Sequence, residues 1–283
     1  MKNNKEEILL ERSIGIIDSG IGGLTVAREI MDLLPNENII YLGDTARCPY
    51  GARTEDEIVE YTLEIVEQLV LLNIKALVIA CNTMTAYTLK YFQEKLSIPI
   101  IGVIEPGART AIRHTKSKYI GIIGTEATIR SESYENHLRM MDGEIKTLGI
   151  PCPLFVPYVE NGIFQGEQLR KIIETSLQPL KQEKQIDTLI FGCTHFPLLK
   201  PAIKQVLNRD LTFVSPSKET ARDLMDVLIK EDDLRTKDDI ATYTFLTTGK
   251  IQTFNDLIEK IIPNEIINHR NIEIKHLRLL HTN

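Results

Sequence analysis

The segment ALVIACNT at residues 76–83 has a counterpart in TLIFGCTH at residues 188–195. In each copy a branched apolar run of strand length ends at a cysteine, and polar side chains follow at once. Such runs alternate with amphipathic stretches along the chain, which is typical of strands and helices that build a largely parallel α/β sheet. The two segments therefore predict two buried strands that end in Cys81 and Cys193.

Two further pairs of segments indicate an internal duplication. IGIIDS at 14–19 corresponds to IGIIGT at 120–125, and VIEP at 103–106 corresponds to FVSP at 213–216. The pairs occur in the same order around each cysteine. We therefore expect two related α/β halves. Ligands of such sheets bind beyond the carboxyl ends of the strands, so the two thiols are expected to approach one ligand from opposite sides.

The same alternation predicts the elements along the chain. The clearest helix begins after Thr54, which forms a capping box with Glu57. Its apolar residues recur at helical spacing: Ile58, Tyr61, Ile65, Leu69 and Leu72. Other helices are expected after Gly22, near Thr83, near Glu167, at Pro197 and near Ser217. The expected strands are 14–18, 38–43, 76–80, 100–104, 119–123, 189–192 and 212–214.

Composition and charge favour a small-molecule partner. The chain has 283 residues, of which 43% are hydrophobic, which is enough for two domains of modest size. The net charge is -6, the pI is ≈ 5.6 and no block is rich in Lys or Arg. Proteins that grip nucleic-acid phosphates carry basic patches, so no nucleic-acid partner is expected.

The N-terminus and the cysteines indicate the compartment. MKNNKEEILLERS at 1–13 lacks an apolar core of signal-peptide length, and the longest apolar runs elsewhere are strand-sized. We therefore expect a cytoplasmic protein without a membrane partner. Cys48, Cys81, Cys152 and Cys193 form no CxxC pair, unlike a zinc knuckle or a secreted disulfide framework. Each is expected to be a free thiol.

The paired cysteines suggest acid–base chemistry. A thiol at the start of a helix lies near N–H groups and the positive end of the helix dipole, which lower its pKa from about 8.5 toward neutrality. One such group on each face of a carbon can remove a proton from one side and return one from the other, which inverts the centre. Free cysteines also serve as packing residues, but packing does not explain two that match in register.

The loop DSGIGG at 18–23 allows two interpretations. It follows a strand and opens a helix, as in dinucleotide-binding sites, and Asp44 lies near the place of a ribose-binding acid. However, the third glycine of that pattern falls on Thr25. The alternative is an amino-acid site, in which Ser19 and N–H groups hold a carboxylate while Asp18 faces an ammonium group. A nucleotide-binding module stays the rival from another class.

Three other features are weaker signals. ARCPYG at 46–51 predicts a turn after the second strand. His195 is a core histidine, a metal ligand or a charge that favours the Cys193 thiolate. A metal site would need Cys81 to converge on this pair, and no second spaced pair of ligands is present, so no metal is expected. Glu160 precedes a turn signal and is expected to be solvated.

The motifs DSGIGG, CPYG, ACNT and GCTHFP occur in this order, and with them the sequence resembles the glutamate racemases of the aspartate/glutamate racemase superfamily. The resemblance runs from about Ile14 to the helix after Ser217. It implies two pseudo-symmetric α/β domains, each a mainly parallel sheet flanked by helices, with the active site in the cleft between them. The first domain would comprise 13–103 plus 216–283, and the second, inserted domain 104–215.

The resemblance also implies an activity. This activity is the interconversion of L- and D-glutamate without a cofactor. It would supply D-glutamate for peptidoglycan, and the enzyme would be a homodimer. A racemase for aspartate or a related amino acid of the same superfamily is the alternative. Two departures stand out: Met84 occupies a place where a smaller residue is common, and the tail from about Lys230 matches no motif.

The site residues follow from the resemblance by position. Cys81 would take the proton of the D-enantiomer and Cys193 that of the L-enantiomer. Asp18 and His195 would assist on their respective sides, and Glu160 matches an acid near the active site. The implied substrate-binding residues are Asp18, Ser19, Pro49, Tyr50, Gly51, Asn82, Thr83, Thr85, Thr194 and His195.

Overall fold

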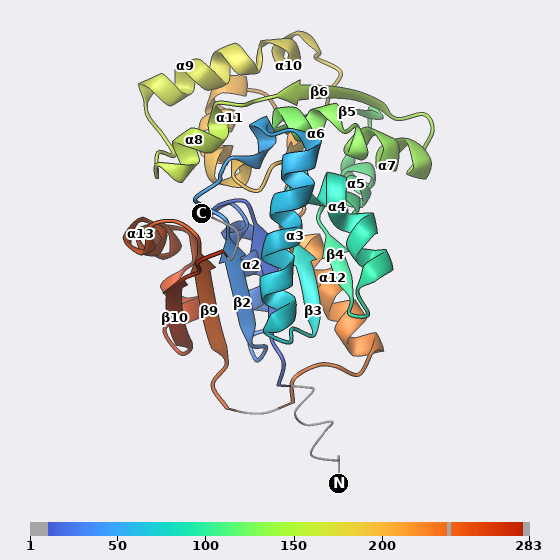
Figure 1. Ribbon diagram of the computed structural model, residues 1–283. Coiled ribbons are helices and arrows are strands. Elements are labelled where there is room, and N and C mark those ends of the chain that lie inside the picture. The colour runs from blue at the N-terminus through green and yellow to red at the C-terminus, as the bar shows by residue number, and fades with distance from the viewer. Residues whose placement is uncertain (1–10, 237–238, 280–283) are drawn as a thin grey trace.

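The computed structural model describes residues 11–236 and 239–279, so most of the N-terminal segment interpreted above lies outside it. The described strands form two sheets, one in each lobe of Figure 1. All neighbouring strands are parallel. The predicted α/β class is therefore confirmed. The first sheet has the order β10-β9-β2-β1-β3-β4 and the second β6-β5-β7-β8.

The strands have these bounds: β1 Ile14–Asp18, β2 Ile39–Gly43, β3 Ala76–Ile79, β4 Ile100–Gly102, β5 Tyr119–Gly124, β6 Lys146–Pro151, β7 Thr188–Gly192, β8 Thr212–Val214, β9 Thr242–Thr247 and β10 Asn271–His276. The seven predicted strands are all present, with ends that differ by one or two residues. The strand expected at 100–104 stops at Gly102, because Val103 already caps the next helix.

The strand register confirms the duplication. In the first sheet Ile14 of β1 lies opposite Ala76 of β3, and in the second sheet Ile120 of β5 lies opposite Thr188 of β7. These are corresponding positions of the repeated segments. The order β2-β1-β3-β4 also has the same arrangement as β6-β5-β7-β8. The two cysteine-bearing strand ends therefore occupy equivalent places.

Two helices cross between the halves. Helix α5, Ile104–His114, follows β4 of the first sheet but packs on β7 and β8 of the second. Helix α12, Ser217–Lys230, follows β8 and packs on α2, Leu24–Leu33, and on β4. The two crossing helices also contact one another. Each half of the chain therefore ends in a helix that packs on the sheet of the other half.

The predicted capping box is present at the start of α3, Glu55–Leu71. Thr54 Oγ1 accepts from the Glu57 N–H at 3.3 Å, and the Glu57 carboxylate accepts from the Thr54 N–H at 2.9 Å. The prediction that Leu72 belongs to the apolar face of this helix is wrong, because the helix stops at Leu71 and Leu72 is 50% exposed.

The remaining helices are α4 Asn82–Lys95, α6 Glu126–Arg130, α7 Ser133–Met141, α8 Phe155–Glu160, α9 Glu167–Ser176, α10 Gln178–Gln182, α11 Lys200–Leu207, α13 Ile251–Ile261 and α14 Asn264–Ile267, with short 3-10 helices η1 Tyr50–Ala52 and η2 Phe196–Leu199. No helix among the described residues is long and apolar enough to cross a membrane.

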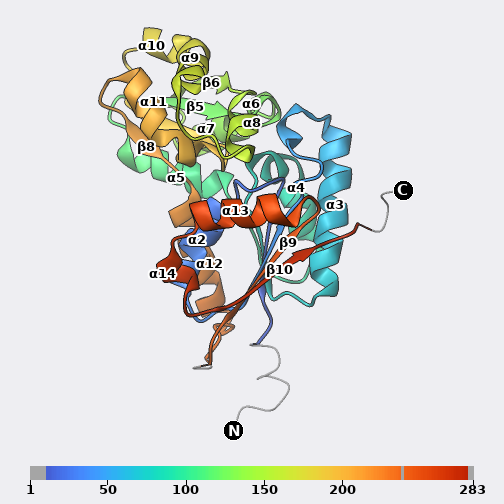
Figure 2. The ribbon, with the colours of Figure 1, turned by 90° about the vertical axis from the view of Figure 1, so that its left-hand side faces the viewer.

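The tail without a motif completes the first sheet. Strand β9 pairs with β2, and β10 pairs with β9. Figure 2 shows α13 lying across the upper part of this sheet, just below the second lobe. Strand β6 was not predicted either, because only Ile150 of it is buried and it therefore carries no continuous apolar run.

Candidate active site

The loops that follow β1, β3, β5 and β7 enclose one cavity between the halves. Its volume is ≈ 10 Å³, which is room for about one water molecule. The lining residues come from both halves: Ser19, Pro49, Tyr50, Gly51, Cys81, Asn82, Thr83, Thr125, Val156, Gly192, Cys193, Thr194 and His195. The predicted convergence of Cys81 and Cys193 on one site is therefore confirmed.

Cys81 caps the N-terminus of α4 and is 6% exposed. Its Sγ lies 3.7 Å from Ser19 Oγ. Burial, with a smaller contribution from the charge of Asp18, raises the pKa of Cys81 to about 12, although the Met84 N–H and Ser19 act in the opposite direction. The predicted fall toward neutrality is wrong for this thiol, because desolvation disfavours the thiolate more than the helix N-terminus stabilises it.

Cys193 has a histidine beside it. Cys193 Sγ lies 3.6 Å from His195 Nδ1, and the other ring nitrogen, Nε2, lies 2.6 Å from Glu160 Oε1. Burial opposes a charge on His195, but Cys193, Cys48 and Glu160 together outweigh it and hold the imidazole pKa well above its usual value. A positively charged ring therefore lies beside the sulfur of Cys193.

Glu160 completes this chain of contacts. Its side chain is 19% exposed, and Oε1 also accepts from the Ile21 N–H at 2.9 Å. Burial alone would raise the carboxyl pKa, but His195 and the Ile21 N–H lower it below its usual value. The expectation of a solvated carboxylate is therefore wrong: Glu160 ends α8 and forms a largely buried ion pair with His195.

Asp18 is fully buried and, although it was predicted to bind the substrate, it is not among the residues that line the cavity. One carboxylate oxygen accepts from the Gly20 N–H at 2.9 Å, and the other accepts from Thr194 Oγ1 at 3.1 Å. Burial raises the pKa of Asp18 against the opposing charge of His195. Asp18 therefore connects the loop after β1 with the loop after β7, and so joins the two halves.

Polar groups line the cavity around the thiols. Tyr134 Oη donates to Asn82 Oδ1 at 2.7 Å, whereas Asn82 Nδ2 is buried and has no hydrogen-bond partner among the described residues. Thr83 Oγ1 lies 2.9 Å from Thr125 Oγ1 of the opposite half. The amide of Asn82 therefore presents an unused donor to a small polar ligand.

The turn at 46–51 closes one side of the cavity. Tyr50 Oη donates to the buried Asp44 carboxylate, so the tyrosine holds the turn by its side chain. A Cβ on Gly51 would lie 2.2 Å from Thr125 Cβ, which leaves room only for glycine. The halves therefore approach each other closely at Gly51 and Thr125.

Two sequence-based expectations need correction. Thr85 is not among the lining residues, because its hydroxyl donates to the Ile79 carbonyl at 2.9 Å at the end of β3. Asp44 has no free oxygen for a ribose, since it accepts from Arg47 at 2.6 Å, from Thr248 at 2.6 Å and from Tyr50. Asp44 is therefore not available as the ribose-binding acid that the dinucleotide alternative requires.

The space over the glycine loop is also occupied. A Cβ on Gly22 would lie 2.3 Å from His195 Nδ1, and one on Gly20 would lie 2.0 Å from Glu160 Oε1. A pyrophosphate would need this space. The glycines instead allow side chains of the second half to approach the loop.

Three lining residues were missed in the sequence: Thr125, Val156 and Gly192. The duplication contained a signal for the first, because Thr125 of IGIIGT corresponds to Ser19 of IGIIDS. Val156 has no counterpart in a motif. Met84 is fully buried and packs in the same core cluster as Cys81 and Tyr50, so the larger side chain fills the wall behind the thiol.

Known proteins resemble this chain over most of its length. A family model described as Asp/Glu/hydantoin racemase matches residues 14–224. The glutamate racemase of Oceanobacillus iheyensis is 46% identical over 89% of this chain and 92% of that protein. The glutamate racemase of Bacillus cereus is 46% identical over 94% of this chain and 98% of that protein.

Solved structures agree with these matches. A glutamate racemase isoform from Bacillus anthracis has a TM-score of 0.86 and 42% identity, and the match covers 95% of this chain and 98% of that one. The glutamate racemase of Francisella tularensis, in complex with D-glutamate, has a TM-score of 0.86 and 31% identity over 96% of this chain and 100% of that one. The protein therefore belongs to the Asp/Glu/hydantoin racemase family.

Proposed function

We propose that this protein is a glutamate racemase that interconverts L- and D-glutamate with two thiols and no cofactor. The observation that carries the proposal is the convergence of Cys81 and Cys193, from equivalent strand ends, on one small polar cavity. The names of the relatives and the D-glutamate complex of the Francisella tularensis enzyme support glutamate as the substrate.

The environments of the two thiols suggest their starting states. The charged ring of His195 lies beside Cys193, whereas burial and Asp18 raise the pKa of Cys81 and keep it protonated. Cys193 therefore takes the α-proton of L-glutamate, and Cys81 returns a proton to the opposite face. The reverse reaction uses the same groups with their protonation states exchanged. Each positioned acid or base supplies about 10²–10⁴-fold in rate.

The carbanion formed between these steps needs stabilisation because the α-hydrogen of an amino acid is a weak acid. Fixed donors aimed at the developing charge provide it in a site that excludes water. Asn82, whose Nδ2 has no partner among the described residues, and Ser19 line the cavity and are suited to hold the α-carboxylate. Thr83, Thr194 and the Pro49–Gly51 turn complete the binding surface.

Other properties belong to the same proposal. The enzyme supplies D-glutamate for peptidoglycan, works in the cytoplasm and forms a homodimer, as the family resemblance implies. The domain limits stay as expected, 13–103 plus 216–283 and 104–215, and the crossings of α5 and α12 near residues 104 and 216 support them.

The direct test is incubation of each glutamate enantiomer with the protein in heavy water. Racemisation followed by circular dichroism, with deuterium entering at the α-carbon by NMR, is the expected result. Cys81→Ala and Cys193→Ala are each expected to lose at least about 10²-fold in rate, whereas Cys152→Ser keeps it. Activity that survives either alanine substitution contradicts the two-thiol assignment. Faster turnover of L-aspartate than of L-glutamate would favour the aspartate alternative.

A further inference from the structure

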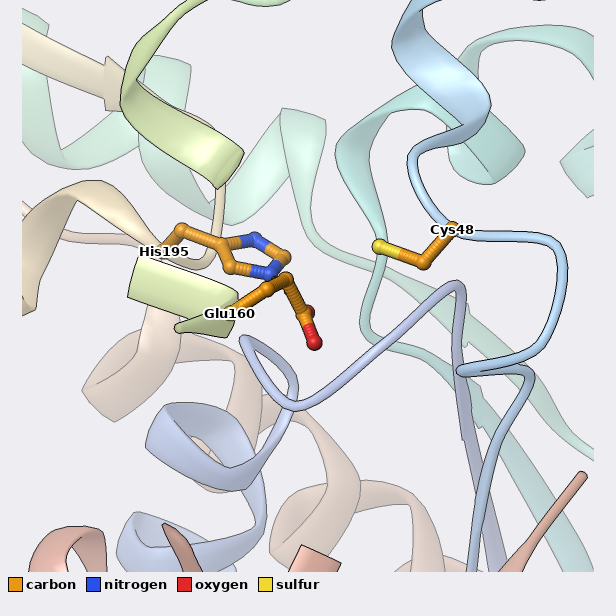
Figure 3. A group of neighbouring side chains, drawn as sticks. All are labelled: Cys48, Glu160 and His195. Atoms are coloured by element: carbon orange, nitrogen blue, oxygen red, sulfur yellow. Dashed lines mark hydrogen bonds and ion pairs between the residues drawn. The ribbon is translucent and has the colours of Figure 1, made fainter. Parts of the chain in front are cut away.

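A second group of potential ligands adjoins the reaction cavity behind His195. Cys48, Glu160 and His195 each place one donor atom so that all three atoms lie within 4.8 Å of one another. Figure 3 shows the thiol of Cys48 pointing toward the carboxylate and the imidazole from the opposite side. The three residues come from the turn before η1, the end of α8 and the loop after β7. The two-thiol reaction uses no group of Cys48.

The chemistry of this group suits zinc. A thiolate, an imidazole nitrogen and a carboxylate oxygen bind Zn²⁺ at about 2.3, 2.0–2.1 and 2.0–2.2 Å, with tetrahedral geometry. Such ligand atoms lie about 3.3–3.7 Å apart around the ion. His195 Nε2 and Glu160 Oε1, at 2.6 Å, would separate by about 1 Å to admit it. Hard cations such as Mg²⁺ disfavour the sulfur ligand.

Gly20 leaves the space between two of the ligands open. A Cβ at this position would lie 2.0 Å from Glu160 Oε1 and 2.8 Å from Cys48 Sγ, so any other residue would fill the gap between them. The ligands are also reachable from outside, because Cys48 is half-buried and the Glu160 side chain is 19% exposed. A cavity of ≈ 230 Å³ beside Asn161 and Lys250 has Glu160 in its wall and is separate from the reaction cavity.

We infer that Cys48, Glu160 and His195 form an inhibitory site for Zn²⁺ or a similarly thiophilic divalent cation. Binding releases the thiol proton of Cys48 and the Nε2 proton of His195 to solvent, and one water completes the coordination. No electron is transferred. The metal then replaces the ion pair between His195 and Glu160, on which the Cys193 side of the site depends, so racemisation stops. The activity readout rests on the proposed function, but metal binding does not.

The test compares serine variants of the full chain at Cys48, Cys152 and Cys193, prepared free of metal. Cys48→Ser keeps a hydrogen-bonding group and removes the sulfur ligand. Cys152→Ser is the matched control, because that thiol is buried and only contacts the Ile150 carbonyl, at 3.7 Å. Racemisation is measured during titration with zinc chloride, and Co²⁺ is added separately to detect a thiolate-to-cobalt charge-transfer absorption.

Zinc is expected to inhibit the unmodified protein and Cys152→Ser equally, with recovery after EDTA. Cys48→Ser should need at least about 10–100-fold more zinc to halve its own metal-free activity and should lack the cobalt absorption. Equal zinc sensitivity of Cys48→Ser, or no cobalt absorption in the unmodified protein, overturns the inference. So does an absorption that persists in Cys48→Ser and disappears in Cys193→Ser, which would place the metal on the reacting thiols. If no racemisation occurs at all, the cobalt spectra still show whether Cys48 binds the metal.

Discussion

His195 and Glu160 form an ion pair in which Nε2 lies 2.6 Å from Oε1, while the Nδ1 edge of the same ring faces Cys193 Sγ at 3.6 Å. The carboxylate therefore acts on the thiol through the imidazole. Burial disfavours a charge on the ring, but Cys193 and, with smaller contributions, Cys48 and Glu160 outweigh it and raise the pKa of His195. The Cys193 side of the cavity therefore has a positively charged ring beside its thiol, whereas the charge that acts on Cys81 is the carboxylate of Asp18.

Substitution Glu160→Gln is expected to change the pH profile of racemisation. Glu160 raises the pKa of His195, so its removal lowers that pKa and the imidazolium is lost at a lower pH. The alkaline limb of kcat/KM should therefore move to lower pH. Glu160→Asp serves as the control that keeps the charge. An unmoved alkaline limb would show that His195 does not depend on this carboxylate.

Substitution Tyr134→Phe is expected to weaken substrate binding. The tyrosine hydroxyl holds Asn82 Oδ1, and without it the amide can rotate its free Nδ2 away from the cavity. Loss of one hydrogen bond, about 1 kcal/mol, corresponds to about fivefold in kcat/KM. Tyr87→Phe is the matched control, because Tyr87 donates to the Ala127 carbonyl at 3.1 Å and does not line the cavity. Steady-state kinetics with equal effects in both variants would contradict a specific role.

Substitution Gly51→Ala is expected to reduce activity at least about tenfold, because the new Cβ would force the halves apart at Thr125. The second substitution Thr125→Gly removes the clashing atoms and should restore part of the rate. Gly143→Ala is the control, since nothing lies within 4 Å of a Cβ at that position. The prediction is checked by measuring the racemisation rates of the three variants. Full activity of Gly51→Ala would mean that the site tolerates a wider separation of the two halves.

A buried ion pair outside the site makes a stability prediction. Lys75 Nζ lies 2.7 Å from Glu37 Oε2, and both side chains are at most 2% exposed. Lys75→Met leaves a buried carboxylate without its counterion, which should lower the free energy of unfolding by about 3–5 kcal/mol. Lys90→Met, at an exposed pair with Glu94, should change it by less than about 1 kcal/mol. The free energies of unfolding are measured by urea denaturation. Similar changes in Lys75→Met and Lys90→Met would contradict the importance of burial.

The sequence by itself determined the elements whose signals are local. Apolar runs and caps predict β1, β3 and α3 because strand formation and capping depend on neighbouring residues. The matched segments also predict the duplication and the pairing of Cys81 with Cys193, since corresponding strands place corresponding residues at one edge. The correspondence of Thr125 with Ser19 also contains the signal that Thr125 lines the cavity.

Only the tertiary structure decided how the groups at that edge behave. The pKa of Cys81 rises because burial removes water from the thiol, and the helix-start pattern in the sequence contains no measure of burial. Glu160 meets His195, and Cys48 meets both, although these residues lie far apart in the chain. Strands β9 and β10 likewise depend on an edge that β2 leaves open. Distances and desolvation arise from packing between distant segments, so they belong to the folded chain.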